Sequence, residues 1–147
     1  MKLSTKGRYG VRALLDLAAH QGEGLILLKD IARRQEVSLP YLEHLITPLI
    51  AAGLVMSTRG ARGGVSLLKP PSEIKLGEVV QLLEGSIAPT DCVNNPDTCH
   101  RSGFCATRDI WIDMKKAMIQ VLDSTTLQDL ADRQREKVQP ETEMYYI

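Results

Sequence analysis

Three cysteines, Cys92, Cys99 and Cys105, lie within one stretch of 14 residues. They are separated by six and five residues, which is too wide for the Cys-x-x-Cys motif of a zinc ribbon or a thioredoxin-type site. An odd number of cysteines in an intracellular chain does not suit disulfide pairing. Soft thiolates bind both iron and zinc. The spacing therefore favours an iron–sulfur cluster with a non-cysteine fourth ligand; the alternatives are a three-cysteine zinc site completed by His100, or inert surface thiols.

Two arginines lie in a glycine-rich stretch in the first half of the chain. Residues 59–64 read Arg-Gly-Ala-Arg-Gly-Gly, so Arg59 and Arg62 are next to glycines that let the backbone approach a ligand closely. A narrow, electronegative DNA minor groove attracts such arginines. A nucleotide phosphate is the alternative ligand, but the stretch lacks the Gly-Lys-Ser/Thr ending of a P-loop. The pattern favours DNA binding.

A second set of DNA-binding candidates lies at the start of a short helix. Ser38 and Tyr41 can donate hydrogen bonds to phosphates, Glu43 can accept from a cytosine amino group, and His44 can bind a purine edge or a phosphate. For Tyr41 and His44 a role as partly packed surface residues is the structural alternative. Four further basic residues could contact phosphates from the first helix: Lys2, Lys6, Arg8 and Arg12.

The elements that must position these side chains form a recognisable unit. Helical apolar spacing covers residues 6–20, 28–35 and 38–52. Two short strands, 54–58 and 65–68, flank the arginine-glycine stretch as a β-hairpin. A helix-turn-helix followed by a basic hairpin is the arrangement of a winged-helix DNA-binding domain.

The second half of the chain is predicted to be mainly helical. Residues 74–84 form an amphipathic helix, residues 86–103 are too rich in proline, asparagine and glycine for a regular element over most of their length, and residues 104–123 form a long helix. Residues 124–126 then cap a last helix that ends at Asp132, where the sequence turns polar. The expected fold class is mainly α with a small β-hairpin wing: a winged helix-turn-helix plus a long dimerisation helix.

The long helix carries an apolar stripe wider than one subunit's core would need. We therefore expect it to hold two copies of the chain together, the alternative being a helix buried within its own subunit. The predicted dimerisation residues are Trp111, Met114, Met118, Val121 and Leu122. The predicted organisation is a DNA-binding domain (1–75), a connecting helix with the cysteine loop (76–105), the dimerisation helix with a short last helix (106–138), and a tail (139–147).

Charge and composition narrow the class of protein further. The 147 residues include 18 Lys+Arg and 18 Asp+Glu, but residues 1–75 hold 11 basic and 6 acidic side chains, and residues 76–147 hold 7 and 12. A basic half beside an acidic half indicates that the first half meets a polyanion, unless the charges are scattered by chance. The longest nearly apolar run has 12 residues, short of a membrane span, and the polar amino terminus predicts a cytoplasmic protein. Two of the three histidines lie in the DNA-binding half and no catalytic triad is visible, so we expect no enzyme.

Four segments resemble the small winged-helix repressors of the IscR, NsrR and CymR family: MKLSTKGRYGVRALLDLA, SLPYLEHL through AAGLV, RGARGGVSL and GEVVQLLEG. The resemblance covers nearly the whole chain. It implies a homodimeric, sequence-specific transcription regulator with one iron–sulfur cluster per subunit, which we expect to be of the 2Fe–2S type. The loop cysteines are similar to those of the IscR branch, which senses cluster status and implies control of cluster biogenesis genes, and of the NsrR branch, which senses nitric oxide. In IscR-type proteins the position of Glu43 reads the promoter class and that of Arg59 enters the minor groove.

The chain departs from this family at the expected fourth cluster ligand. IscR-type proteins carry a histidine three residues after the last cysteine, and this chain has Arg108 there, which stays protonated and cannot ligate. NsrR-type proteins can use an acidic residue of the partner's first helix, and the matching residue here is Arg8. The fourth ligand is therefore open among a partner-subunit group and His100, Asp91, Asp97 and Asp109.

The carboxyl terminus resembles the CymR branch instead, which regulates cysteine metabolism and lacks the cluster cysteines. The similar segments are VLDSTTLQDLA and the final Met-Tyr-Tyr-Ile. Polar, proline-containing residues 139–143 predict a tail without a packed core of its own. Its apolar end either folds back onto the dimer or docks elsewhere. Because cysteine synthase captures a terminal isoleucine carboxylate from its partner enzyme, the resemblance implies that Ile147 could dock there.

Overall fold

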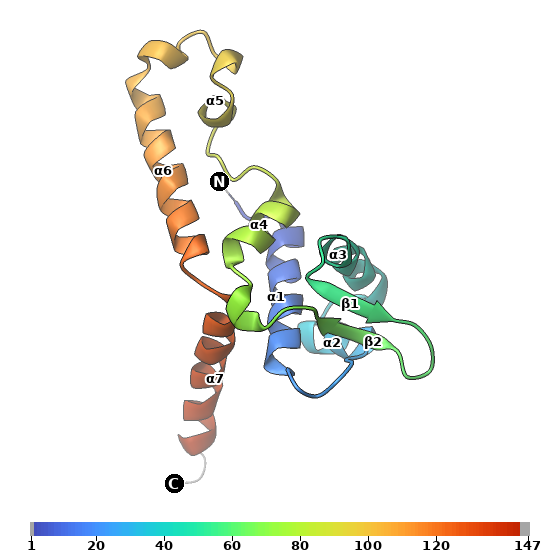
Figure 1. Ribbon diagram of the computed structural model, residues 1–147. Coiled ribbons are helices and arrows are strands. Elements are labelled where there is room, and N and C mark those ends of the chain that lie inside the picture. Colours follow the sequence, from blue (N-terminus) through green and yellow to red (C-terminus); the bar gives the residue numbers. More distant parts are fainter. Residues whose placement is uncertain (1, 145–147) are drawn as a thin grey trace.

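The computed structural model describes the backbone of residues 2–144 and the side chains of residues 2–138. Three helices and a hairpin form the first unit, on the right in Figure 1. They are α1 (Thr5–Ala19), α2 (Leu28–Gln35), α3 (Leu39–Ala51), β1 (Val55–Thr58) and β2 (Gly64–Leu67). The predicted winged helix-turn-helix is confirmed.

Local sequence signals explain where these helices begin and end. The hydroxyl of Ser4 accepts from the Gly7 backbone N–H at 3.0 Å and caps α1, while Ser38 accepts from the Tyr41 N–H at 3.3 Å and caps α3. The helix-turn-helix bend is made by Glu36, a non-glycine residue in the left-handed region with φ 57°.

The hairpin pairs antiparallel from Val55 opposite Leu67 to Thr58 opposite Gly64. An isolated bridge between Ile26 and Val65 joins the hairpin to the segment before α2. Buried side chains from all the elements of the unit meet in one core, which includes Leu14, Ile31, Leu42, Leu49, Leu54, Val65, Ile74 and Val79. The wing is therefore held firmly at its base, and its tip extends away from the helices (Figure 1).

Helix α4 (Leu76–Glu84) follows the 3-10 turn η1 (Pro71–Glu73) and packs closely on α1. Two glycines make this approach possible, because a Cβ on Gly7 would overlap the Glu84 carboxylate and a Cβ on Gly10 would overlap Leu83. The Glu84 carboxylate also accepts from the backbone N–H and the hydroxyl of Ser4, at 2.9 and 2.6 Å. The start of α1 is thereby fixed to the end of α4.

The cysteine segment and helix α6 (Ala106–Asp123) form an arm that projects away from the winged helix (Figure 1). We use "the arm" for residues 86–123. The segment predicted to be irregular contains only single turns: α5 (Asp91–Asn94), η2 (Pro96–Thr98) and η3 (Ser102–Phe104). The long helix begins at Ala106, two residues later than predicted, because η3 ends at Phe104 and Cys105 is extended.

The prediction for the last helix has the right start but is wrong in its length. Helix α7 runs Leu127–Met144, past the predicted end at Asp132 and through the predicted proline-broken tail as far as Met144. Residues 133–137, which are all strong helix formers (Arg, Gln, Glu and Lys), carry it beyond Asp132. Leu127 and Ala131 are buried in the core of the winged helix, where α7 packs on α1 and η1.

Residues 145–147, with the predicted docking residue Ile147, lie outside the described residues. Within the described part of the chain, no helix combines the length and apolar character that a membrane span requires.

Candidate DNA interface and cysteine site

The predicted DNA-binding residues lie on three elements of the winged helix: the amino-terminal part of α1, the start of α3, and the hairpin tip. Most of their side chains are exposed, and Lys6 and Tyr41 are half-buried. The exposed ones are Lys2, Arg8, Ser38, Glu43, His44, Arg59 and Arg62. Glu43 and His44 are adjacent in the first turns of α3, the part of a recognition helix that meets base edges.

An aromatic contact links α3 to α1. The rings of Tyr9 and Tyr41 meet edge to face, with centroids 6.2 Å apart at 83°. Tyr41 therefore has the packing role that was the structural alternative at this position, which leaves its hydroxyl group for a phosphate contact. Tyr9 was not among the predicted site residues, although it is the one aromatic residue of the first helix.

Arg12 contacts other residues of the chain. Its Nε donates to Gln35 Oε1 at 3.0 Å and its Nη2 donates to the Gln35 carbonyl at 3.3 Å. The guanidinium lies over the Tyr9 ring, 4.8 Å from the centroid. These contacts hold Arg12 between α1 and α2 and help to position the helix-turn-helix. A phosphate contact by the exposed Arg12 side chain stays a prediction.

A buried carboxylate fixes α2 against α1. Asp16 accepts two hydrogen bonds from Arg34, at 2.9 and 2.6 Å, and one from Gln35 at 2.9 Å. The hydrogen bond to Asp16 is the main reason that the pKa of Arg34 is raised. Sequence reasoning missed this network; the signal was an aspartate on the apolar face of a predicted helix, between Leu15 and Leu17.

The tip of the wing carries both predicted arginines. Arg59 and Arg62 are exposed, and the glycine between them, Gly60, has φ 110°. The Gly63 N–H donates to the Gly60 carbonyl at 2.9 Å and closes the turn. The glycines thus allow a tight turn that presents two cationic side chains away from the core.

The three cysteines are free thiols in the arm and are half-buried. Cys92 Sγ lies 3.2 Å from the Thr90 hydroxyl oxygen, and Cys105 Sγ lies 3.1 Å from that of Thr107. The hydrogen bond with Thr107 is the largest of the effects that lower the pKa of Cys105, and the backbone N–H of Arg108 adds to it. This environment favours the thiolate, the form that binds metals.

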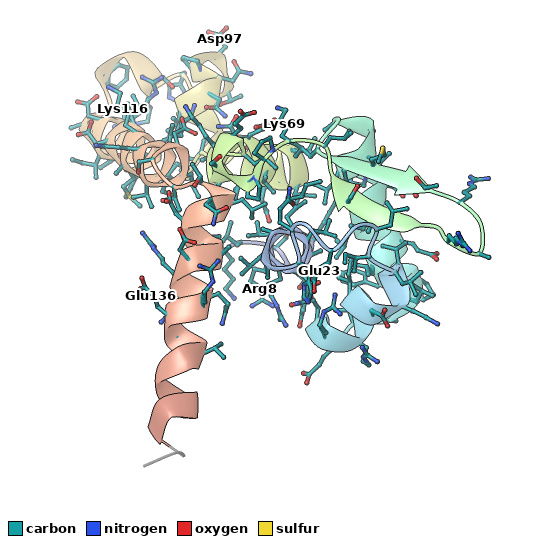
Figure 2. All side chains as sticks on the ribbon, turned by 60° about the horizontal axis from the view of Figure 1, so that its bottom comes forward. Arg8, Glu23, Lys69, Asp97, Lys116 and Glu136 are labelled. Atoms are coloured by element: carbon teal, nitrogen blue, oxygen red, sulfur yellow. The ribbon has the colours of Figure 1, made fainter. Side chains whose placement is uncertain are left out.

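The described residues do not contain a group of three or more His, Cys, Asp or Glu side chains placed to hold a metal ion. The fourth-ligand candidates His100, Asp91, Asp97 and Asp109 are all exposed. Figure 2 shows Asp97 in the arm, well separated from Arg8 on α1. The assignment of the three cysteines as metal ligands therefore stays a prediction.

Arg108, which replaces the expected histidine ligand, has a clear contact. Its Nε donates to the Cys92 backbone carbonyl at 3.0 Å. It thereby connects the first turn of α6 to α5, and this contact had no signal in the sequence.

The apolar stripe of α6 is not buried within the subunit. Trp111, Met114, Met118 and Leu122 are half-buried, and Val121 is 65% exposed. An open hollow of about 390 Å³ beside the stripe is lined only by apolar residues, namely Leu3, Val80, Ile87, Ala117, Met118, Val121 and Leu122. The alternative of a helix buried in its own subunit does not describe this structure, since no residue of α6 is buried.

Comparison with known proteins agrees with this architecture. Residues 3–133 match the model of the Rrf2 family, described as iron-dependent transcriptional regulators. The HTH-type transcriptional regulator CymR of Bacillus subtilis is 45% identical over 131 residues, which cover 89% of this chain and 90% of that protein. The structure of the same CymR, titled the global cysteine regulator, superposes with a TM-score of 0.78 at 44% identity, over 90% of this chain and 98% of the other. The structure of T. potens IscR superposes with a TM-score of 0.77 at 45% identity, over 94% of this chain and 91% of the other. The chain belongs to the Rrf2 family of transcriptional regulators.

Proposed function

We propose that this transcription regulator senses iron–sulfur cluster status through Cys92, Cys99 and Cys105 and controls genes of cluster biogenesis. The observation that carries the proposal is the set of three free thiols in one projecting arm, one of them with a lowered pKa. CymR-type relatives lack these cysteines, so their presence here favours the IscR-type signal.

The donor set fits an iron–sulfur cluster in its chemistry. Thiolates are the usual protein ligands of such clusters, and hydroxyl or backbone hydrogen bonds to their sulfurs tune the cluster. The three cysteines would hold it, and a bound cluster would supply a redox-sensitive, iron-dependent link between α5 and α6. Thr90 and Thr107 orient the outer thiols, and Arg108 keeps α5 beside α6.

DNA binding follows from the winged helix and the dimer that we propose. The open apolar face of α6 would pack against the same face of a second copy, which gives a two-fold symmetric pair of winged helices. A pseudo-palindromic operator matches that symmetry. Glu43 and His44 would read the major groove, and Arg59 the minor groove.

The deciding experiment is anaerobic purification with iron and sulfide analysis. We expect an iron-to-sulfide ratio near one and a visible charge-transfer band, both of which are lost in a Cys92→Ser/Cys99→Ser/Cys105→Ser variant. A colourless product that contains zinc or no metal would contradict the proposal. Nitric oxide added to the cluster-loaded protein tests the NsrR-type signal. This signal requires that the protein is released from operator DNA when nitric oxide is stoichiometric with the cluster.

A second candidate function is regulation by a protein partner in cysteine metabolism. It is favoured by the 45% identity to CymR and by the terminal Tyr-Tyr-Ile sequence. We propose as its partner cysteine synthase, which would bind the Ile147 carboxylate through backbone amides. Calorimetric titration of the host's cysteine synthase with the intact chain and with a chain lacking residues 146–147 tests this candidate. Binding by the intact chain alone supports it, while equal binding by both chains, or by neither, contradicts it.

A further inference from the structure

Arg108 makes a long-range contact inside the arm. Its Nε donates to the carbonyl oxygen of Cys92 at 3.0 Å, across 16 residues of sequence, and the contact is partly buried. The acceptor belongs to α5, the single helical turn that holds Cys92. A guanidinium keeps its charge and offers donors only, so this residue binds a carbonyl and never a metal.

The same residue lies next to the last cysteine along the chain. Cys105 immediately precedes α6, and Arg108 is in the first turn of that helix. The side chain of Arg108 therefore joins the helix that follows Cys105 to the turn that holds Cys92. The length of one arginine side chain limits how far these two segments can move apart.

The threonine hydroxyls act on the same two cysteines. Thr90 contacts Cys92 Sγ at 3.2 Å, and Thr107 contacts Cys105 Sγ at 3.1 Å. No comparable contact to Cys99 Sγ is found among the described residues. The outer two thiols thus each have a hydroxyl contact that can orient them, and within the described residues the middle thiol has none.

We infer that Arg108 is a positioning residue that holds Cys92 and Cys105 as a preformed pair of metal ligands, to which Cys99 is added when the site is filled. The role toward a metal rests on the proposed function, whereas the preformed pair does not. Arg108, which occupies the position of the expected histidine ligand, is thereby assigned a structural role. The expected consequence is that loss of the Arg108 side chain loosens α5 in the metal-free protein.

Hydrogen exchange of the metal-free protein tests the preformed pair. The relevant amides are Val93, which donates to the Thr90 carbonyl, and Asn95, which donates to the Asp91 carbonyl at 3.0 Å. In Arg108→Gln we expect both amides to exchange about tenfold faster, the size of change that follows from loss of one hydrogen bond to a charged donor. Lys116→Gln, which removes an exposed charge from the same helix, should leave them unchanged.

The amides of α3 serve as the control for folding, since α3 is remote from the arm. Arg108→Lys is a second, milder variant, which keeps the charge but lacks the planar Nε donor, and should also exchange faster. Equal exchange in wild type, Arg108→Gln and Arg108→Lys would overturn the inference. Faster exchange in Lys116→Gln as well would equally overturn it, because the effect would then be one of charge alone.

Iron loss to a chelator from the anaerobically reconstituted protein tests the step toward the metal. We expect Arg108→Gln to lose iron several times faster than wild type and Lys116→Gln to match wild type. Equal rates in all three would overturn the positioning role while the proposed function stands. A wild-type protein that takes up no iron would overturn the proposed function and this step with it, and the exchange result would still decide whether the pair is preformed.

Discussion

The basic side chains that we propose to meet DNA divide into two groups by what they would recognise. Lys2, Lys6 and Arg8 lie on α1 or just before it and would contact phosphates, a contact that does not depend on sequence. Arg59 and Arg62 lie on a turn that can enter a groove, where width and electronegativity depend on base composition. The two groups should therefore respond differently to substitution and to salt.

Arg59→Ala should reduce affinity most for operators that are A·T-rich under the wing, because a narrow minor groove has the strongest negative potential. Lys6→Ala should weaken binding to all sequences similarly and lower the slope of log affinity against log salt by about one. Fluorescence anisotropy over a salt series, with A·T-rich and G·C-rich operators, measures both effects.

Lys69→Ala is the control, since its ammonium pairs with Glu78 at 3.6 Å on α4. It should leave both the affinity and the salt slope unchanged. An Arg59→Ala protein with unchanged specific affinity at physiological salt would show that the wing does not enter the groove.

Much of the candidate site was visible at this scale from the sequence alone. Cysteine spacing and the arginine-glycine turn are local patterns, so residue type and position were enough to find them. The contacts of Asp16, Glu84 and Arg108 were not predicted, because each of these residues binds a partner between 16 and 80 residues away. Such contacts exist only after the helices have packed.

At the scale of the elements, helix α7 also has one feature that the local sequence predicts and others that it does not. Its start was predictable, since Thr126 and Asp129 form a reciprocal cap: the Thr126 N–H donates to Asp129 Oδ2 at 2.9 Å, and the Asp129 N–H donates to Thr126 Oγ1 at 3.1 Å. Its end was not predictable, because residues 133–137 have good helix propensity and give no stop signal, and the helix then continues past Pro140, where the sequence predicted a break. The packing of α7 on α1 depends on the buried residues Leu127 and Ala131. Two apolar residues are too few for the sequence to indicate which element α7 packs against.

Thr126→Ala should lower the free energy of unfolding by about 1 kcal/mol, the usual cost of a lost helix cap. The backbone N–H of Thr126 is the largest cause that holds the pKa of Asp129 below its usual value, and a hydrogen bond from the Thr126 side chain adds to it. The stabilisation that the Asp129 carboxylate contributes is therefore present above the usual pKa of an aspartate. It is lost as the pH falls through the lowered pKa of Asp129. Urea denaturation at neutral pH and at acidic pH measures the free energy of unfolding of both proteins. The difference in this free energy between Thr126→Ala and wild type should be smaller at acidic pH.

Thr98→Ala is a matched control, because its hydroxyl bonds only the neighbouring Asn95 carbonyl in the arm. It should leave the unfolding free energy of the winged helix nearly unchanged. A difference between Thr126→Ala and wild type that grows in acid would contradict the assigned cap.

The molecule as a whole consists of a well-packed winged helix and an arm with no buried residue on its long helix. An apolar surface of this kind indicates a partner surface. The periodicity of α6 predicted the helix and its stripe. The structure adds the hollow formed with Leu3, Val80 and Ile87, which come from the segment before α1, from α4 and from the start of the arm.

Met114→Asp should shift the protein from dimer to monomer or aggregate, because it places an unpaired charge in the apolar face of α6. Light scattering coupled to size exclusion measures the mass. Gln120→Asp adds the same charge at an exposed polar position of α6 and should remain dimeric. A Met114→Asp protein that is fully dimeric and soluble would refute the proposed interface.

The contact between Glu84 and Ser4 has a mechanical consequence. Ser4 opens the helix that carries Lys6 and Arg8, and Glu84 lies two residues before Ser86, where the arm begins. Gly7 and Gly10 let the side chains of Glu84 and Leu83 lie directly against the backbone of α1. We therefore expect the arm to behave as a lever with its fulcrum at this joint, so that a change of angle in the arm turns the amino-terminal end of α1 with it.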